Sequence, residues 1–211
     1  LALDDEKSKS YRENCLENES DIDYEKINGM THEKLYSYFY NSKEIVKKDK
    51  GWEFLYVEKD YLGSKLDFDL VDSAKGKVFG KANEKFNSVI AKKIKDDSVK
   101  MIYVENDFLI GKYLSKDIYD KETGIIFFEA GDEISQETID FFDENKISTI
   151  DILDINSNKQ GSYIRDTFFA DKNKNRNDAI TEIYKILRPG EPPTLEAADK
   201  LFRSLFFDRE R

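Results

Sequence analysis

A short run near the C-terminal end, Arg188-Pro189-Gly190-Glu191-Pro192-Pro193, restricts the backbone more than any other part of the sequence. Proline fixes its own φ and has no N–H to donate, so a helix that arrives at Arg188 has to end there. The glycine permits a positive φ within the turn. The run therefore predicts a rigid elbow between two helices.

Apolar residues recur at helical spacing on both sides of this elbow. Before it they are Ile180, Ile183, Tyr184 and Leu187, and after it they are Leu195, Ala198, Leu201, Phe202 and Leu205. We expect Asn177 or Asp178 to cap the first helix and Thr194 to cap the second. The pattern predicts two amphipathic helices that meet at the elbow.

Arg188 is the residue for which we expect a nucleic-acid contact. Because it lies beside a stiff turn, its guanidinium would be held out at a low entropic cost, as a phosphate contact requires. The alternative is a corner that only packs. A second basic stretch, Lys172, Lys174 and Arg176, alternates with Asn and either touches a phosphate backbone or forms a solvated loop. It lacks the interleaved aromatic residues of a stacking platform for single strands.

Composition narrows the class of protein. Hydrophobic residues make up 39% of the 211 residues and aromatic residues 13%, which is enough to build a core. The net charge of −10 argues against a dedicated nucleic-acid-binding domain, because such domains carry a basic face. No apolar run is long enough to span a membrane. The single cysteine, Cys15, excludes an internal disulfide and fits a reducing cytoplasm.

The acidic charge is uneven along the chain. From Gly161 onward, ten Lys and Arg residues stand against nine Asp and Glu residues, so this part carries about +1 and residues 1–160 carry about −11. This asymmetry predicts an acidic module that faces solvent or a protein partner, and a nearly neutral C-terminal part that can face an anion. A merely soluble surface is the alternative explanation.

Both ends of the chain indicate a piece of a longer protein. The chain begins at Leu1 without an initiator Met and stops at Arg211 without a terminating signal, so we expect it to continue on both sides. Residues 4–26 predict a polar helix or a mobile segment. A short amphipathic helix is expected at 31–40, with Thr31 as its cap.

Other local patterns predict strands and loops. The charged run 43–50 is expected to be exposed. Alternating apolar residues predict strands at 52–56 and 66–70. Residues 164–169 are expected to be extended, and residues 171–177 are expected to form a charged loop before the first helix of the elbow.

An internal repeat with an offset of about 48 residues occupies the middle of the chain. Asp72, Gly76, Ala82, Phe86, Ile94, Val99 and Ile102 correspond to Asp120, Gly124, Ala130, Ile134, Phe142, Ile147 and Ile150. In each copy an Asp-x-x-x-Gly turn joins two short strands, a helix follows (89–95 or 135–145), and a strand closes the copy (100–104 or 149–155). The copies share no charged constellation, so the repeat predicts duplicated architecture rather than duplicated active sites.

No catalytic site emerges from the sequence. His32 is the single histidine, and Cys15 lies among acidic residues that disfavour a thiolate. Asp67, Asp69 and Asp72 alternate, but the central Gly and the closing Glu of a calcium loop are not in register. We therefore expect no catalytic residue, no metal site and no cofactor in this chain.

The elbow and its flanks resemble the lobe of the β subunit of bacterial DNA-directed RNA polymerase. The matching stretches are the core 188–193 together with Gly161, Tyr163-Ile164, Glu182-Ile183-Tyr184, Glu196-Ala197-Ala198 and Leu205-Phe206-Phe207. The resemblance extends more weakly through 66–160, which looks like the insertion that some bacterial β subunits carry within the lobe. Leu1-Ala2-Leu3 and the helix at 31–40 resemble the lobe segment that enters this insertion, whereas 4–26 departs from the pattern.

This resemblance implies a role in transcription, by a nucleotidyltransferase whose magnesium-binding aspartates belong to another subunit. The lobe forms one wall of the DNA cleft, and the insertion is expected to offer an outward docking surface for transcription regulators. In the family the arginine of the elbow lies near the DNA channel, and this role is carried over to Arg188 alone. The implied partners are the other polymerase subunits and, in the whole enzyme, DNA, with no membrane.

The sequence as a whole predicts an α+β chain. Mainly helical lobe segments at 1–42 and 161–211 would flank a compact acidic insertion at 43–160 that contains the two β–helix–β copies. Two alternatives stay open. One is a free-standing acidic protein-interaction module that binds a basic partner, and the other is a hydrolase whose carboxylate pair is assembled only in space.

Overall fold

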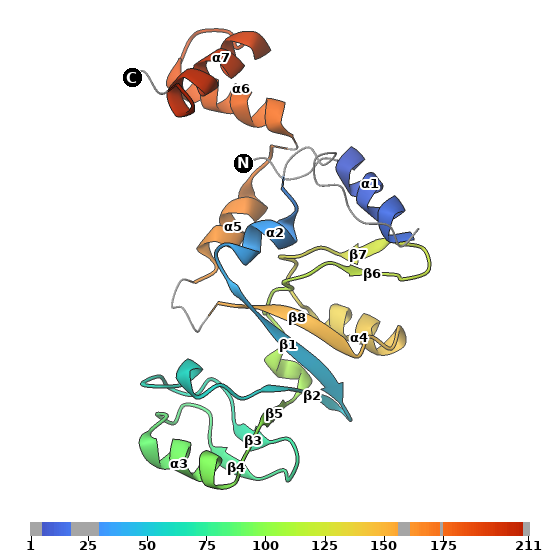
Figure 1. The fold of residues 1–211 in the computed structure, drawn as a ribbon, viewed down its shortest axis with the longest axis vertical. Coiled ribbons are helices and arrows are strands. Elements are labelled where there is room, and N and C mark those ends of the chain that lie inside the picture. Colours follow the sequence, from blue (N-terminus) through green and yellow to red (C-terminus); the bar gives the residue numbers. More distant parts are fainter. Residues whose placement is uncertain (1–5, 18–29, 156–160, 174, 209–211) are drawn as a thin grey trace. The chain divides into compact units, whose positions relative to one another are not determined.

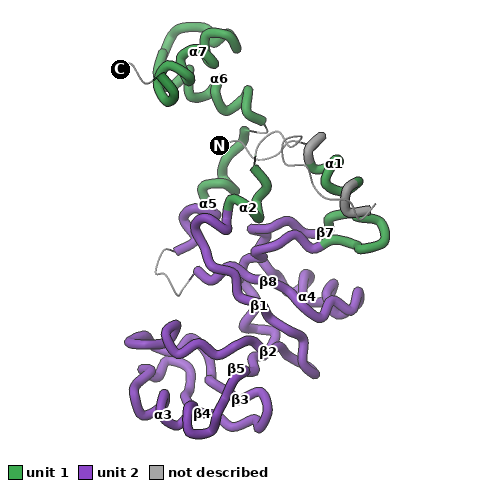
Figure 2. Tube along the Cα trace, viewed as in Figure 1, with its two compact units in different colours: residues 1–35, 119–126, 167–211 green, residues 36–118, 127–166 purple. Residues whose placement is uncertain are grey.

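The computed structural model describes residues 6–17, 30–155, 161–173 and 175–208. Within them the chain is a mixed α and β protein, with helices, a six-stranded sheet and a two-stranded sheet (Figure 1). It divides into two compact units (Figure 2). Unit 1 comprises residues 1–35, 119–126 and 167–211, and unit 2 comprises residues 36–118 and 127–166.

The described elements alternate along the chain. The α-helices are α1 (Glu6–Glu17), α2 (His32–Ser37), α3 (Ser88–Asp96), α4 (Gln136–Glu144), α5 (Tyr163–Ala170), α6 (Arg176–Leu187) and α7 (Leu195–Phe206). The strands are β1 (Asn41–Lys48), β2 (Gly51–Leu55), β3 (Leu70–Asp72), β4 (Val78–Gly80), β5 (Met101–Val104), β6 (Ile118–Tyr119), β7 (Ile126–Phe128) and β8 (Thr149–Asp154). Short 3₁₀ turns at Glu58–Asp60 and Asn106–Phe108 follow β2 and β5.

A single hydrophobic core holds unit 2 together. The large sheet has the order β4-β3-β5-β2-β1-β8, and all of its pairs are antiparallel. Ile150, Ile45, Phe54 and Ile102 are register partners in one row across four neighbouring strands, and all are at most 1% exposed. Burying each such side chain contributes about 1.5–3 kcal/mol, so this row fixes the register of the sheet.

The strand prediction at 52–56 is confirmed by β2, but the charged run 43–50 was misjudged. It forms most of β1, a central strand that pairs with both β2 and β8. Ile45 is fully buried, while the lysines point their charges to partners at the surface; Lys47 Nζ lies 2.6 Å from Asp143 Oδ1. Long lysine stems can cover apolar surface and keep the ammonium in water, so a charged run is compatible with a central strand.

The strand predicted at 66–70 begins only at Leu70. Leu66 lies in a loop, where its N–H donates to the carbonyl of Glu84 at 2.9 Å. The Asp69 carboxylate accepts the N–H of Ala82 at 2.7 Å. A local side-chain bond such as that of Asp69 competes with a strand ladder, and the backbone of Leu66 is already bonded to a loop residue, so the alternating pattern did not produce a strand here.

The segment expected to be extended at 164–169 is helical. It forms α5, whose first turn carries a bond from Ser162 Oγ to Asp166 Oδ2 at 2.7 Å. Within unit 2, Arg165 is buried and its Nε donates to the carbonyl of Gly131 at 2.8 Å. These contacts outweigh the weak local preference of the aromatic and β-branched residues for a strand.

The remaining helix predictions of the first two-thirds are confirmed, although α2 ends at Ser37 and not at residue 40. Thr31 caps α2 through a bond from the N–H of Lys34 to its Oγ1 at 3.3 Å. Asn87 caps α3, and Ser135 forms a capping box with Thr138 at the start of α4. The helix α1 lies inside the polar stretch 4–26, whose residues 4, 5 and 18–26 are outside the described part.

Backbone hydrogen bonds recur at an offset of 48 residues, as from Asp72 to Asp120. The matched pairs are Gly76 N to Asp72 O and Gly124 N to Asp120 O, each 2.8 Å, and Leu66 N to Glu84 O and Leu114 N to Asp132 O, each 2.9 Å. The order β3-β4-α3-β5 is followed by the order β6-β7-α4-β8. The sheets differ, because β3 and β4 join the large sheet whereas β6 and β7 form a sheet of their own.

Candidate functional site

The elbow joins α6 to α7 within unit 1. The N–H of Arg188 closes the last turn of α6 on the carbonyl of Tyr184 at 2.8 Å. Gly190 has a φ of +92°, the left-handed conformation that this glycine was expected to allow. Thr194 caps α7, since its Oγ1 accepts the N–H of Ala197 at 3.3 Å. The predicted elbow between two helices and the predicted second cap are confirmed.

The first helix of the elbow begins earlier than predicted. Its cap is Asn175, whose Oδ1 accepts the N–H of Asp178 at 3.0 Å, and the prediction of Asn177 or Asp178 as the cap was wrong. Asp178 lies instead in the first turn. A carboxylate is favourable there because the helix N-terminus carries a partial positive charge.

Arg188 lies at the surface, but it has a counter-ion. Its Nη1 is 3.5 Å from Glu191 Oε1, and both side chains are about half exposed. The hydroxyl of Tyr184 donates to Glu191 Oε2 at 2.8 Å, and this bond raises the pKa of Tyr184. Glu191 therefore ties the turn back to the C-terminal end of α6 through two contacts. The sequence reasoning missed this role, although the i, i+3 spacing of Arg188 and Glu191 signals it.

Most other basic residues near the elbow are already paired. Asp199 of α7 accepts from Arg176 Nη2 at 2.7 Å and from Arg203 Nε at 2.6 Å, and these two guanidiniums lower the pKa of its carboxyl. Arg176 thus belongs to a helix and not to a basic loop, and Lys174 lies outside the described residues. An open hollow of about 650 Å³ nearby is lined by Arg176, Lys200, Arg203, Ser204, Phe207 and Asp208.

The alternating aspartates serve the backbone. Asp69 accepts the N–H of Ala82, and Asp72 Oδ1 accepts the N–H of Ala74 at 3.1 Å. In the part of the chain that the structure describes, no group of three His, Cys, Asp or Glu residues could hold a metal ion. Nor does any described helix have the length and apolar composition needed to cross a membrane.

Comparison with known proteins identifies relatives along most of the chain. No family model matches the sequence. The DNA-directed RNA polymerase subunit beta of Caulobacter vibrioides is 40% identical over 183 residues, which is 87% of this chain and 14% of that protein. The proteins of the same name from Rhizobium leguminosarum and Rickettsia akari are also 40% identical, over 184 and 185 residues and 13% of their length. Over 87% of its length, this chain is therefore a homologue of one segment of the bacterial DNA-directed RNA polymerase β subunit.

Proposed function

We propose that this chain is a non-catalytic part of the β subunit of a bacterial RNA polymerase and serves DNA-templated RNA synthesis. The observation that carries the proposal is the 40% identity to β subunits along 87% of the chain. The chain spans only about one seventh of the length of these relatives, 14% for the first. Nucleotidyl transfer would therefore be the activity of the whole assembly, with the other subunits and DNA as partners.

Within that subunit, the α6–α7 hairpin would form part of the lobe, one wall of the cleft that holds DNA. Large apolar side chains that remain exposed on the hairpin support this role: Ile186, Leu187, Leu195, Leu205, Phe206 and Phe207. Phe206 and Phe207 lie against the ring of Phe202, and such an exposed cluster marks a surface that another protein surface covers. The rest of the β subunit would provide that cover.

Unit 2 would be the insertion, with a surface that docks transcription regulators. The recurring turns support the inference that residues 70–104 and 118–154 are two copies of one β–helix–β unit. Unit 2 carries 24 Asp and Glu residues against 19 Lys and Arg residues, a net charge of −5. An acidic surface repels a phosphate backbone and attracts a basic protein surface, so we infer a protein partner for unit 2.

Arg188 would contact a DNA phosphate from the lobe. Its present ion pair with Glu191 is exposed, and exposed pairs contribute at most about 1 kcal/mol. A phosphate can therefore replace the Glu191 carboxylate as the partner of the guanidinium. Glu191 also holds Tyr184, so it keeps the turn in place while it competes for Arg188.

Two substitutions that should change the lifetime of the open promoter complex in opposite directions test this contact in the complete polymerase. With Arg188→Ala, the open promoter complex should dissociate faster, and the logarithmic salt slope of its stability should fall by about 1. With Glu191→Gln, the competing charge is removed, so the complex should last longer. Lys185→Ala is the matched control, because Lys185 lies on α6 and is paired with Glu182. An unchanged salt slope for Arg188→Ala would remove the phosphate role.

A further inference from the structure

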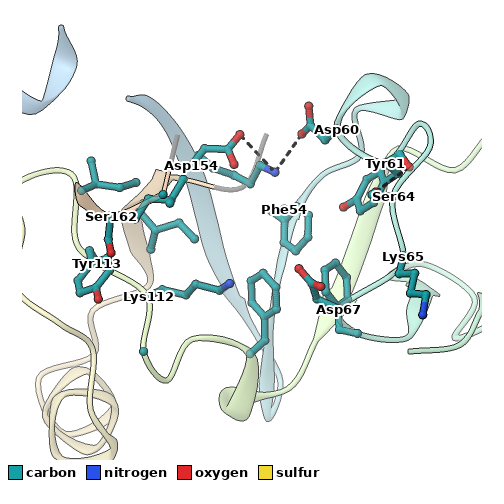
Figure 3. Close-up of a pocket in the computed structure, with 18 residues that line it drawn as sticks. Phe54, Asp60, Tyr61, Ser64, Lys65, Asp67, Lys112, Tyr113, Asp154 and Ser162 are labelled. Carbon is teal, nitrogen blue, oxygen red and sulfur yellow. Dashed lines mark hydrogen bonds and ion pairs between the residues drawn. The ribbon is translucent and has the colours of Figure 1, made fainter. Parts of the chain in front are cut away.

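A hollow of about 460 Å³ opens within unit 2 (Figure 3). It is lined by residues of β1, β2 and β8, of the segments 60–68 and 108–113, and of the segment 161–162 that precedes α5. Its volume is that of cavities that hold small ligands. None of the contacts assigned to the elbow reaches this hollow, and the proposed function does not use it.

Three phenylalanine rings give the hollow an apolar wall. Phe54 and Phe108 are stacked, with ring centroids 5.5 Å apart and an angle of 18° between the planes. Phe68 meets Phe108 edge to face at 4.7 Å. Phe68 and Phe108 are only half-buried, so part of each ring faces the hollow. A flat aromatic group would gain both buried apolar area and favourable ring contacts against this wall.

The two lysines near the wall differ in their charge balance. Lys43 Nζ forms ion pairs with Asp60 Oδ2 at 3.0 Å and with Asp154 Oδ2 at 3.9 Å, so two carboxylates already balance its charge. Lys112 Nζ lies 5.2 Å from the centroid of the Phe108 ring, and within the described residues no carboxylate reaches ion-pair distance of it. Figure 3 shows the Lys112 ammonium extending along the wall. The hollow thus offers one half-buried cation beside an aromatic surface.

We propose that this hollow binds a small aromatic ligand that carries a single carboxylate. The ring would pack against Phe68 and Phe108, and the carboxylate would accept a hydrogen bond from the Lys112 ammonium. Asp60, Asp67 and Asp154 also line the hollow. Because Asp60 and Asp154 are matched by Lys43, the Lys112 ammonium is left to balance one negative charge, so we infer a monoanion and not a nucleotide or a polyphosphate.

The comparison of the two repeated segments supports a specific role for Lys112. Ser64 occupies the equivalent position 48 residues earlier, where its hydroxyl donates to the carbonyl of Tyr61 at 2.8 Å. The backbone bonds match at the two positions, since Ser64 N donates to Tyr61 O and Lys112 N to Leu109 O. The turn therefore needs no lysine, and the ammonium is available for a ligand.

The test is a binding titration of the 211-residue chain with 3-phenylpropionate, followed by the NMR shifts of the amides around Phe108 and Lys112. We expect saturable binding with a dissociation constant of the order of 1 mM, as for a ligand of this size. The neutral amide of the same acid should bind about fivefold more weakly to the unmodified chain. This comparison needs no variant, so it stands even if a substitution disturbs folding.

Variants of Lys112 test whether its ammonium is the group that binds the ligand carboxylate. Lys112→Met keeps an apolar stem and should weaken 3-phenylpropionate binding about fivefold, whereas Lys112→Arg should restore it. Lys92→Met is the matched control, because Lys92 is exposed on α3 outside the hollow. Equal binding by the Lys112→Met variant, or tighter binding of adenosine monophosphate than of the acid, would overturn the proposal. Absence of saturable shifts around the hollow would overturn it as well.

Discussion

The α6–α7 hairpin and unit 2 differ in how far their large apolar side chains are buried. In unit 2, Trp52 and Phe142 are fully buried and meet edge to face, with ring centroids 6.4 Å apart. On the hairpin, Phe206 is 65% exposed and Phe207 is 70% exposed, and both lie against the ring of Phe202. Both regions are rich in aromatic residues, yet only unit 2 encloses them within the described part of the chain.

This difference indicates which region depends on a partner. A buried cluster stabilises the unit that contains it, whereas exposed aromatic residues contribute little until another surface covers them. We therefore expect substitutions in unit 2 to act on the stability of the isolated chain. Substitutions on the hairpin should act on assembly instead.

The largest effect is expected for Phe142→Ala. Removing a fully buried ring from the interface of α4 and the sheet leaves a cavity, so the free energy of unfolding should fall by about 3–5 kcal/mol. Urea unfolding of the purified chain, followed by tryptophan fluorescence, measures this loss. A loss below about 1 kcal/mol would mean that unit 2 is not tightly packed and would break the comparison.

A smaller effect is expected for Gly131→Ala. Gly131 has a φ of +94°, and an added Cβ would lie 2.6 Å from the Tyr36 ring, so both backbone strain and overpacking should cost about 2–3 kcal/mol. Gly63→Ala is the matched control, with a φ of +79° and nothing within 4 Å, and should cost about 1 kcal/mol. Equal losses in the two variants would show that the Tyr36 contact is loose.

Tyr56→Phe should stabilise unit 2. Within the described residues the Tyr56 hydroxyl is buried without a hydrogen-bond partner, so its removal should raise the free energy of unfolding by up to about 1 kcal/mol. Burial raises the pKa of Tyr56 to about 12 from its ordinary value of 10.0. The neutral form is thus favoured in the folded state, and this contribution is present below pH 10 and lost as the pH rises toward 12.

The measurement for Tyr56 is a pair of urea unfolding series, at neutral pH and between pH 10 and 12. The Phe variant should be more stable at neutral pH and should lose less stability on the alkaline side. Tyr36, whose pKa burial also raises to about 12, remains in both proteins and provides the common background. A less stable Phe variant at neutral pH would show that the hydroxyl has a partner.

The smallest effect on the isolated chain is expected for Phe206→Ala on α7. Because Phe206 is mostly exposed, its removal should change the free energy of unfolding by no more than about 0.5 kcal/mol. In the complete polymerase the same substitution should reduce the yield of assembled enzyme. Size-exclusion chromatography of the co-expressed subunits measures that yield. A large loss of stability in the isolated chain would contradict the contrast with unit 2.

The sequence correctly predicted those turns and helix ends that depend on one or two neighbouring residues and not on the rest of the fold. The Pro189 stop, the Gly190 turn and the Thr194 cap are fixed by the chemistry of single residues, and they were confirmed. The Asp72 and Asp120 turns were likewise visible in the sequence, because a side chain and a glycine together define each turn.

The misjudged elements depend on contacts that a sequence pattern does not contain. Whether 43–50 forms a central strand depends on β2 and β8, which pair on either side of it. The helix at 164–169 likewise depends on Arg165, whose guanidinium is buried over the Tyr113 ring at 4.3 Å and helps to hold α5. The hollow beside Lys112 was not foreseen either, since residues from six separate segments line it and no local spacing links them.

Hydrogen exchange in α7 tests most directly whether the hairpin is built for a partner. The amides of Leu195–Phe206 would be compared in the isolated 211-residue chain and in the assembled polymerase, with those of β5 as the internal reference. The account predicts that exchange in α7 slows by at least about tenfold on assembly while exchange in β5 changes little. Equal exchange rates of α7 in the two samples would contradict the claim that the polymerase covers this apolar surface.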